Sequence, residues 1–326
     1  MFQKNSHGRN VVVKEGKLLK RLLVVFLCAV IISALGFCIV MFIKSRTNSG
    51  VSLISLRAKW RDGDYGGAYD ISGQLLYDRP FNHTALLFRG YSSFYLAAAE
   101  NDTVQAQGLI DEAIASLRQA LLFEKDGGKN LPRIEYMLGK SYFYKDFLSA
   151  YHYYADLSVK YLQSALSHGY KADDIPEILG LNYAALGMTL ESISSFSEAL
   201  LVKQSDLLLL SIAEQYHAAG QNQAAEQYLY RISQECKDEK ITLKSRYLLG
   251  DIYLEGELLE NAEKEFRSII DEYDGSEHAA DAYYGLGLVF EKQNEMAKAR
   301  SEWRKALRIQ SNHAGALAAL KKSSER

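Results

Sequence analysis

The feature that most constrains the fold is one residue pattern that occurs three times. The stretches LGLNYAALGMTLESISSFSEAL, LGDIYLEGELLENAEKEFRSII and LGLVFEKQNEMAKARSEWRKA begin at Leu179, Leu249 and Leu286 and align without a gap. In each stretch Leu-Gly is followed by an aromatic residue, a small residue, a second large aromatic residue, and finally alanine or isoleucine. Self-similarity of this kind indicates an array of repeated units and not one globular core.

Each copy is expected to form two antiparallel helices that cross closely. Helices approach closely only where a side chain is small, so Gly287 and Ala299 mark the crossing in the third copy. Phe290 and Trp303 are expected to fill the space beside it. Packing explains these residues, so none of them is a catalytic candidate. The turn between the two helices is polar, and the three copies place glycine or asparagine there: Gly187, Gly256 and Asn294.

The pattern resembles the tetratricopeptide repeat, whose consensus has Leu-Gly and then tyrosine on its first helix, and alanine, an aromatic residue and alanine on its second. Residues 212–232 supply a fourth copy, with Ala213, Tyr216, Gly220, Ala225 and Leu229 at the equivalent positions. Residues 173–313 are therefore identified as regular repeats. The resemblance implies an all-α solenoid of helical hairpins.

Residues 44–172 hold more divergent copies with insertions. LGKSYFY pairs with DLSVKYLQSAL, FRGYSSFYLA pairs with LIDEAIASLRQAL, and Ala58–Pro80 is a degenerate first unit. The last copies repeat every 37 residues, against a consensus of about 34, so their helices or their linkers are longer. Residues 314–326 are expected to form the C-terminal cap helix. The array then has about six to seven repeats and a cap.

The apolar segment 22–43 has 22 residues and no charge. At about 1.5 Å per residue, a helix of this length crosses the roughly 30 Å hydrocarbon layer of a bilayer. It is too long for the apolar region of a cleaved signal peptide, and we expect a transmembrane anchor. A buried core helix is one alternative, although such a helix seldom lacks a polar face. Lipid attachment at Cys28 or Cys38 is another, although Leu27 and Phe37 stand where a small residue is needed.

The charges that flank this segment predict its orientation. Residues 14–21 carry four basic side chains, whereas Lys44 and Arg46 flank the exit side. Because positive residues are retained in the cytoplasm, residues 1–21 are expected to be a basic cytoplasmic tail. Residues 44–326 then lie outside the cytoplasm, in the periplasm if the cell is bacterial. The reverse topology remains the alternative.

The distribution of charge argues against a nucleic-acid partner. The chain has a formal charge of −2, and its first 21 residues carry +5, which leaves −7 for the remainder. Binding to DNA or RNA depends on a basic surface, which a mildly acidic body does not offer.

Three cysteines are too few for a disulfide framework.

Catalytic and metal-binding constellations are not found. The seven histidines form no HExxH motif or His/Cys cluster, and there is no glycine-rich phosphate loop or GxSxG motif. Paired acids such as Asp173 and Asp174 lie next to expected helix starts, where they stabilise the helix dipole. We therefore expect no enzyme, no cofactor and no metal.

The resemblance implies a concave groove lined by the outward side of each first helix. An aromatic and aliphatic strip with interspersed charge is suited to hold a peptide or a helix, because tyrosine gives a large contact area at low entropic cost. Alternatively, neighbouring repeats or the chain's own insertions cover these residues. The lysines and asparagines of the family's carboxylate clamp for chaperone tails are absent. The expected groove residues are Leu87, Tyr91, Phe94, Tyr136, Lys140, Phe143, Glu177, Leu181, Leu210, Glu214, His217, Tyr247, Asp251, Tyr284 and Leu288.

The function that follows is a scaffold. An anchor joined to a solenoid without a catalytic cluster predicts a single-pass protein of the cell (inner) membrane that recruits a protein or peptide partner, in the assembly or organisation of the cell envelope. With the reverse topology, the same array would be a cytoplasmic receptor or targeting factor.

Overall fold

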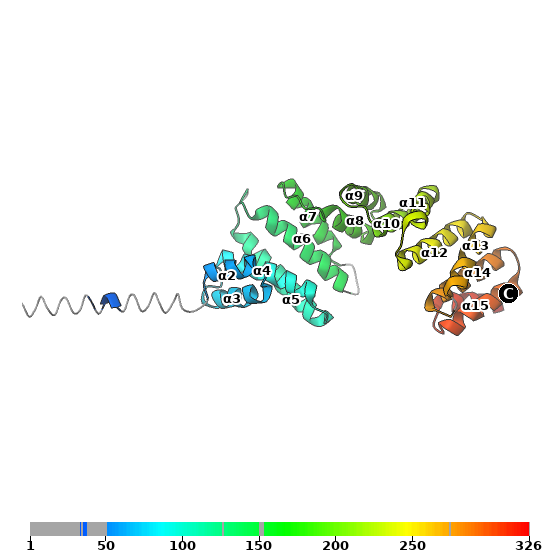
Figure 1. Cartoon of the computed structure of the whole chain (residues 1–326), viewed down its shortest axis with the longest axis horizontal. Coiled ribbons are helices and arrows are strands. Elements are labelled where there is room, and N and C mark those ends of the chain that lie inside the picture. The colour runs from blue at the N-terminus through cyan, green and yellow to red at the C-terminus, as the bar shows by residue number, and fades with distance from the viewer. Residues whose placement is uncertain are drawn as a thin grey trace, which may run out of the picture. The chain divides into compact units, whose positions relative to one another are not determined.

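A computed structural model of the chain describes residues 33, 35–37, 51–125, 127–149, 153–273 and 275–325. Within these residues every element is a helix, and the helices are joined by short turns (Figure 1). The chain divides into two compact units, Met1–Leu96 and Ala97–Arg326. The described part of the chain is therefore all-α, as the repeats predict.

The first unit contains α2 (Leu53–Arg61), α3 (Tyr65–Asp78) and most of α4 (His83–Ala99). Ser52 and Ser55 form a capping box at the start of α2, and the Asp64 carboxylate accepts a hydrogen bond from the Gly67 amide at the start of α3. These caps define a short hairpin of α2 and α3. Arg89 of α4 donates to the Tyr69 carbonyl at 2.7 Å, which joins α4 to α3.

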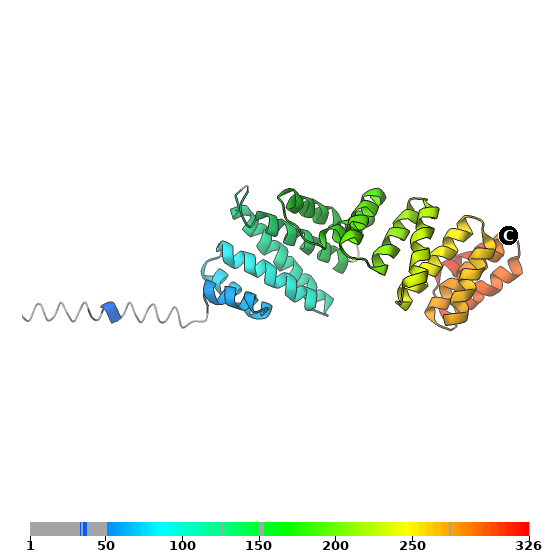
Figure 2. The same ribbon diagram turned by 45° about the horizontal axis from the view of Figure 1, so that its top comes forward.

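The second unit is a series of helices in which each contacts the next along the chain (Figure 2). The last turn of α4 and α5 (Thr103–Phe123) come first. The following helices pair as hairpins: α6 (Leu131–Leu148) with α7 (Ala155–Ser167), α8 (Ile175–Ala185) with α9 (Thr189–Val202), α10 (Asp206–Ala218) with α11 (Asn222–Glu235), α12 (Glu239–Glu255) with α13 (Leu259–Tyr273), and α14 (Glu277–Lys292) with α15 (Met296–Ile309). Helix α16 (Ala314–Ser324) packs against α15.

Several first helices of successive hairpins also contact one another. Helix α6 contacts α8, and α12 contacts both α10 and α14. In the described part of the chain, the second helices of successive hairpins make no contact of comparable extent. The first helices therefore form one layer of the array, and the second helices form the other.

Small residues do mark the helix crossings. A Cβ atom added to Gly180 would lie 2.5 Å from the Phe196 ring, and one added to Gly250 would lie 2.6 Å from Phe266. At Gly287 the same atom would overlap the Trp303 indole even more closely. Trp303 is fully buried. The predicted pairing of glycine with a large aromatic residue is confirmed in all three copies.

The divergent copies use the same device. A Cβ atom on Gly139 of α6 would lie 2.6 Å from Leu162 of α7. The Ser158 hydroxyl of α7 donates to the Gly139 carbonyl at 2.8 Å, as the Ser192 hydroxyl does to the Gly180 carbonyl. A buried hydroxyl that bonds across the crossing therefore accompanies the close approach in both hairpins.

The three turns place the left-handed residue at different residue types. Gly187 and Asn294 have positive φ angles of 70° and 63°, but Gly256 has a φ of −74°. The residue with positive φ in that hairpin is Glu257, at 59°. The next amide, that of Leu258, donates back across the helix end to the Tyr253 carbonyl at 2.8 Å. This hydrogen bond requires a positive φ at the residue just before Leu258. That residue is Glu257, so a glutamate and not the preceding glycine adopts the left-handed conformation.

The longer spacing of the last copies comes from their first helices. Helices α12 and α14 have 17 and 16 residues, whereas α8 and α10 have 11 and 13. The added residues lie at the N-terminal ends of α12 and α14, before Gly250 and Gly287. Of the two explanations for the longer repeat spacing, the structure therefore shows longer helices and not longer linkers.

The predicted membrane segment, 22–43, lies outside the described residues except for four residues, Ser33, Leu35, Gly36 and Phe37, which are helical. Residues 1–21 also lie outside them. Among the residues that the structure describes, no helix is both long enough and apolar enough to cross a bilayer.

Candidate functional site

The expected groove residues of α4 are not on the surface. Leu87, Tyr91 and Phe94 are 8%, 4% and 5% exposed. The Tyr91 ring lies 5.7 Å from that of Trp60, within the first unit. Helix α4 carries apolar or small side chains on most of its circumference, so its sequence does not identify an outward face. The three residues are therefore buried in the structure, and a groove along α4 stays a prediction of the sequence.

The expected residues of α6 are engaged within the array. The Tyr136 side chain is 9% exposed, and its hydroxyl lies 2.9 Å from both carboxylate oxygens of Asp174. The Lys140 ammonium binds the same carboxylate at 2.7 Å. Tyr136 also stacks on Tyr170, with ring centroids 4.6 Å apart. These groups join α6 to the segment before α8, while Phe143 is half-buried.

The middle of the array offers little open surface at the expected positions. Leu210 is buried and Glu177 is half-buried, whereas Leu181 is 38% exposed. Leu181 is therefore the only one of these three with substantial exposure.

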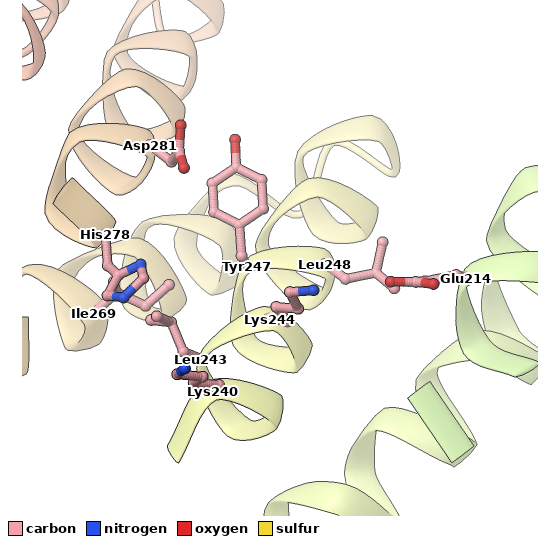
Figure 3. A pocket seen from close by; sticks show the side chains of 9 residues that line it. All are labelled: Glu214, Lys240, Leu243, Lys244, Tyr247, Leu248, Ile269, His278 and Asp281. Carbon is pink, nitrogen blue, oxygen red and sulfur yellow. The ribbon is translucent and has the colours of Figure 1, made fainter. Parts of the chain in front are cut away.

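A pocket of about 420 Å³ lies on the layer of first helices in the last repeats (Figure 3). Helix α12 contributes most of its wall, and α10, α13 and α14 complete it. Two of the predicted residues, Glu214 and Tyr247, are in this pocket. Its lining residues are Glu214, Lys240, Leu243, Lys244, Tyr247, Leu248, Ile269, His278 and Asp281.

The lengthened helices build this pocket. In comparison with α8, the additional N-terminal residues of α12 include Lys240, Leu243 and Lys244, and those of α14 include His278 and Asp281. The Asp238 carboxylate accepts hydrogen bonds from two amides of the first turn of α12 and so fixes the start of that helix. Sequence analysis missed these five lining residues. The spacing of 37 residues was the signal, because the extra residues add almost one helical turn.

The floor of the pocket is apolar, and one of its ends is basic. Leu243, Leu248 and Ile269 form the floor together with the ring of Tyr247. Lys240 and Lys244 are exposed and make no ion pair within the described chain. Glu214 faces Lys244 from α10 (Figure 3). Desolvation raises the pKa of the Glu214 carboxyl, and the Lys244 ammonium opposes that shift.

The other end of the pocket is acidic and aromatic. Tyr247 extends toward Asp281 (Figure 3). Burial raises the pKa of the Tyr247 hydroxyl, and the nearby carboxylates of Asp251 and Asp281 raise it further. Asp251 lies one turn beyond Tyr247 on the same face of α12, and Tyr284 of α14 faces both residues closely enough for their charges to interact. Of these four groups, Tyr247 and Asp281 line the pocket, whereas Asp251 and Tyr284 are not among its lining residues.

Asp251 is the least compensated charge at this end. Its side chain is half-buried, and within the described residues it has no hydrogen bond or ion pair. Burial raises its pKa to about 6, the His217 imidazole lowers it, and the Glu255 and Asp281 carboxylates raise it. The charged form of a half-buried carboxylate without a donor is unfavourable, which agrees with this raised pKa.

Neighbouring side chains fix the remaining predicted residues. His217 Nδ1 lies 3.0 Å from the Asn222 side-chain oxygen. Tyr284 lies against Gly315 and has its ring centroid 5.0 Å from that of His313. Leu288 is half-buried against the last hydrophobic cluster.

Helix α16 closes this end of the layer through His313. The His313 Nδ1 atom accepts a hydrogen bond from the Ala316 amide at 3.1 Å, which assigns the ring proton to Nε2. Nε2 then donates to the Asp281 carboxylate at 3.0 Å. Asp281 is thereby held in place, with its second oxygen outside this bond. In the described part of the chain, no three His, Cys, Asp or Glu side chains are close enough to hold a metal ion.

The hairpins, their two layers and the pocket on the first-helix layer define a helical-repeat solenoid. Residues 280–313 match the model of the tetratricopeptide repeat. The chain therefore contains a tetratricopeptide repeat at the position that its residue pattern predicts, and the described helices have the corresponding fold of helical hairpins. A comparison with curated proteins gave no match.

Solved structures share the fold. The C-terminal part of a tetratricopeptide-repeat protein from Cytophaga hutchinsonii has a TM-score of 0.57 and 10% identity, over 82% of this chain and 99% of that one. A repeat protein from Parabacteroides merdae has a TM-score of 0.46 and 18% identity, over 83% and 97% of the two chains. YrrB, described as having an unusual peptide-binding site, has a TM-score of 0.47 and 20% identity, over 64% and 100%. At these identities the similarity concerns the fold alone.

Proposed function

We propose that this chain is a membrane-anchored scaffold whose repeat array binds a protein or peptide partner on its layer of first helices. The observation that carries the proposal is the pocket of about 420 Å³ formed by α10, α12, α13 and α14. It combines an apolar floor with charged groups at both ends, which is the composition that recognition of a peptide requires. We place the binding site at α10 to α16.

The membrane part of the proposal is supported by the sequence. The 22 uncharged residues of segment 22–43 suit a transmembrane helix, and the basic residues before it favour a cytoplasmic N-terminus. In this topology residues 44–326 lie outside the cytoplasm, and the partner is a component of the cell envelope. The second candidate is the reverse topology, with the array as a cytoplasmic receptor or targeting factor.

Site-specific photocrosslinking in living cells tests the binding proposal. A photoreactive residue at Tyr247 lies in the pocket, and one at Glu260 of α13 lies on exposed surface outside it and serves as the matched control. We expect one protein to be captured from Tyr247 and not from Glu260. Capture of the same proteins from both positions, or of none, would refute a partner in the pocket.

A reporter fused after Arg326 tests the topology. An enzyme that is active only outside the cytoplasm should be active in this fusion, and a reporter that needs the cytoplasm should be inactive. The opposite pair of results would establish the second candidate and remove the envelope role.

We further propose that the array is not an enzyme. The purified chain should turn over no envelope substrate. Turnover that is lost on substitution of Glu214 or His217 would overturn this part of the proposal.

A further inference from the structure

The hairpin of α2 and α3 carries exposed apolar side chains at one of its ends. Its two helices are joined by a turn at residues 62–64, in which the Asp64 amide donates to the Lys59 carbonyl at 2.9 Å. Because the helices of such a hairpin run antiparallel, the start of α2 and the end of α3 both lie away from the turn, at what we call the open end. Ile54, Tyr77 and Phe81 lie there and are 81%, 89% and 71% exposed. Large apolar side chains with this exposure, gathered at one end of a hairpin, indicate an interaction surface.

The chain enters the hairpin at the same open end, where Ser52 caps the start of α2. Seven residues, 44–50, separate the apolar segment 22–43 from Val51. A chain spans at most about 3.6 Å per residue, so these seven residues reach no further than about 25 Å in any conformation. An anchor at 22–43 therefore keeps the open end close to the surface of the bilayer.

Basic side chains accompany the apolar ones. Arg57 lies one turn after Ile54 on the same face of α2, and Arg79 lies between Tyr77 and Phe81; both arginines are exposed. In the described part of the chain, neither arginine forms an ion pair. Lys44 and Arg46 add two further charges in the segment that leads to the hairpin.

The carboxylates of the hairpin lie mostly elsewhere. Asp62 and Asp64 are in the turn, and Asp70 lies in the first half of α3. Asp78 is the one carboxylate of residues 51–82 that lies at the open end. The open end is therefore apolar and basic, which is the composition of a surface that binds an anionic membrane.

We propose that the open end of the α2–α3 hairpin rests on the bilayer that holds the anchor. Ile54, Tyr77 and Phe81 enter the interfacial layer, and Arg57 and Arg79 lie beside anionic phospholipid head groups. This inference rests on the membrane anchor of the proposed function and adds a second contact with the same membrane. It holds for either topology, because it depends on the length of the connection and not on the side of the membrane.

The covalent connection makes so small a surface sufficient. Three apolar side chains and two arginines bind a bilayer weakly when the protein diffuses freely. A short connection to an anchor makes the contact intramolecular, so the local concentration of lipid is high and weak binding is enough. Tyrosine is also well suited to the interface, because its ring is apolar and its hydroxyl reaches the head groups.

Quenching of a fluorophore by doxyl-labelled lipid tests the proposal. The full-length chain, with its three cysteines replaced by serine, receives one NBD fluorophore at Tyr77→Cys and is reconstituted in phosphatidylglycerol nanodiscs. Asp62→Cys is the matched control, since Asp62 is also exposed but lies in the turn. We expect the lipid to remove most of the emission at position 77 and little at position 62. Equal quenching at both positions, or none at position 77, would overturn the proposal.

A pair of double variants tests the charge. Arg57→Gln with Arg79→Gln should reduce the quenching at position 77 to the level found in phosphatidylcholine nanodiscs. Lys203→Gln with Lys237→Gln removes two exposed charges from the second unit and should leave the quenching unchanged. Undiminished quenching in the arginine variant would refute the contact with anionic head groups. A blue-shifted emission at position 77 without quenching by lipid would show that protein, such as a second copy of the chain, covers the open end, and would also overturn the proposal.

The native cysteines separate this inference from the proposed function. A chain that keeps Cys38 alone carries its fluorophore within segment 22–43. If doxyl-labelled lipid quenches the label at Cys38 but not the label at position 77, the anchor stands and only this inference is wrong. If it quenches neither label, the membrane anchor of the proposed function fails as well.

Discussion

Replacing Gly287 with alanine tests the packing that underlies the whole array. A Cβ atom at this position would overlap the Nε1 and Cδ1 atoms of Trp303, more closely than the 2.5 Å approach to Phe196 at Gly180. Trp303 is fully buried, so its indole moves only if α15 shifts away from α14. Overpacking of this kind costs about 1–3 kcal/mol, and the better helix propensity of alanine returns about 1 kcal/mol. We expect a net loss of up to about 2 kcal/mol in the free energy of unfolding, and of more than about 2 kcal/mol for Gly287→Leu.

Gly108 provides the matched control. It lies in the N-terminal third of α5, is exposed, and has no atom within 4 Å of an added Cβ atom. The same substitution, Gly108→Ala, should therefore stabilise the chain by about 0.5–1 kcal/mol, because alanine favours helix. The sign of the effect thus differs between two glycines in helix interiors, and only the tertiary contact distinguishes them.

Urea unfolding followed by tryptophan fluorescence measures both effects. The chain has two tryptophans, and Trp60→Phe leaves Trp303 as a reporter of the last hairpin. A double-mutant cycle with Trp303→Ala, followed by far-ultraviolet circular dichroism because this variant lacks the fluorescent reporter, supplies the mechanism, since Gly287→Ala should cost nothing once the indole is gone. An unchanged midpoint for Gly287→Ala, or a full loss that persists in the Trp303→Ala background, would refute the predicted register.

Three further predictions follow from single residues. Asp251 has a pKa raised from 3.8 to about 6, so the unfolded chain releases this proton first and stability falls as pH rises between these values. Asp251→Asn should abolish this fall and raise the free energy of unfolding at pH 7 by about 1–3 kcal/mol, as measured by urea unfolding across pH. Glu257 has a φ of 59°, so Glu257→Gly should raise the free energy of unfolding by about 0.5–1 kcal/mol. An unchanged urea midpoint would contradict backbone strain at this residue. Asn182 is buried and donates to Ser158 at 3.0 Å; Asn182→Ala should cost about 1–3 kcal/mol in the same assay, whereas a neutral result would show that this bond contributes little.

The comparison of sequence and structure is clearest at the helix crossings. Gly287 and Trp303 lie 16 positions apart in one hairpin. The small residue and the large residue that packs against it therefore belong to the same short segment. A pattern repeated in several copies then fixes which helices pair and in which register. The all-α solenoid was predictable for this reason.

Exposure was not predictable in the same way. Tyr91 and Tyr136 occupy positions that the register assigns to the groove, yet one is buried in the first unit and the other is bonded to Asp174. Whether a side chain on a helix face reaches solvent depends on segments far along the chain, and a repeat pattern contains no information about them. Both residues belong to the divergent copies, and their neighbours, Trp60 and Asp174, lie more than 30 positions away in the sequence.

The pocket depends both on features that are visible in the sequence and on the tertiary structure. The sequence by itself determined that the last repeats are longer than the consensus, and it placed Tyr247 on the layer of first helices. Only the tertiary structure decided that the added turns of α12 and α14 bring Lys240 and Asp281 to opposite ends of one apolar floor. The physical reason is that local residue patterns fix the pairing of two helices within a hairpin, whereas a binding site needs side chains from several hairpins, whose relative positions depend on the packing of the whole layer.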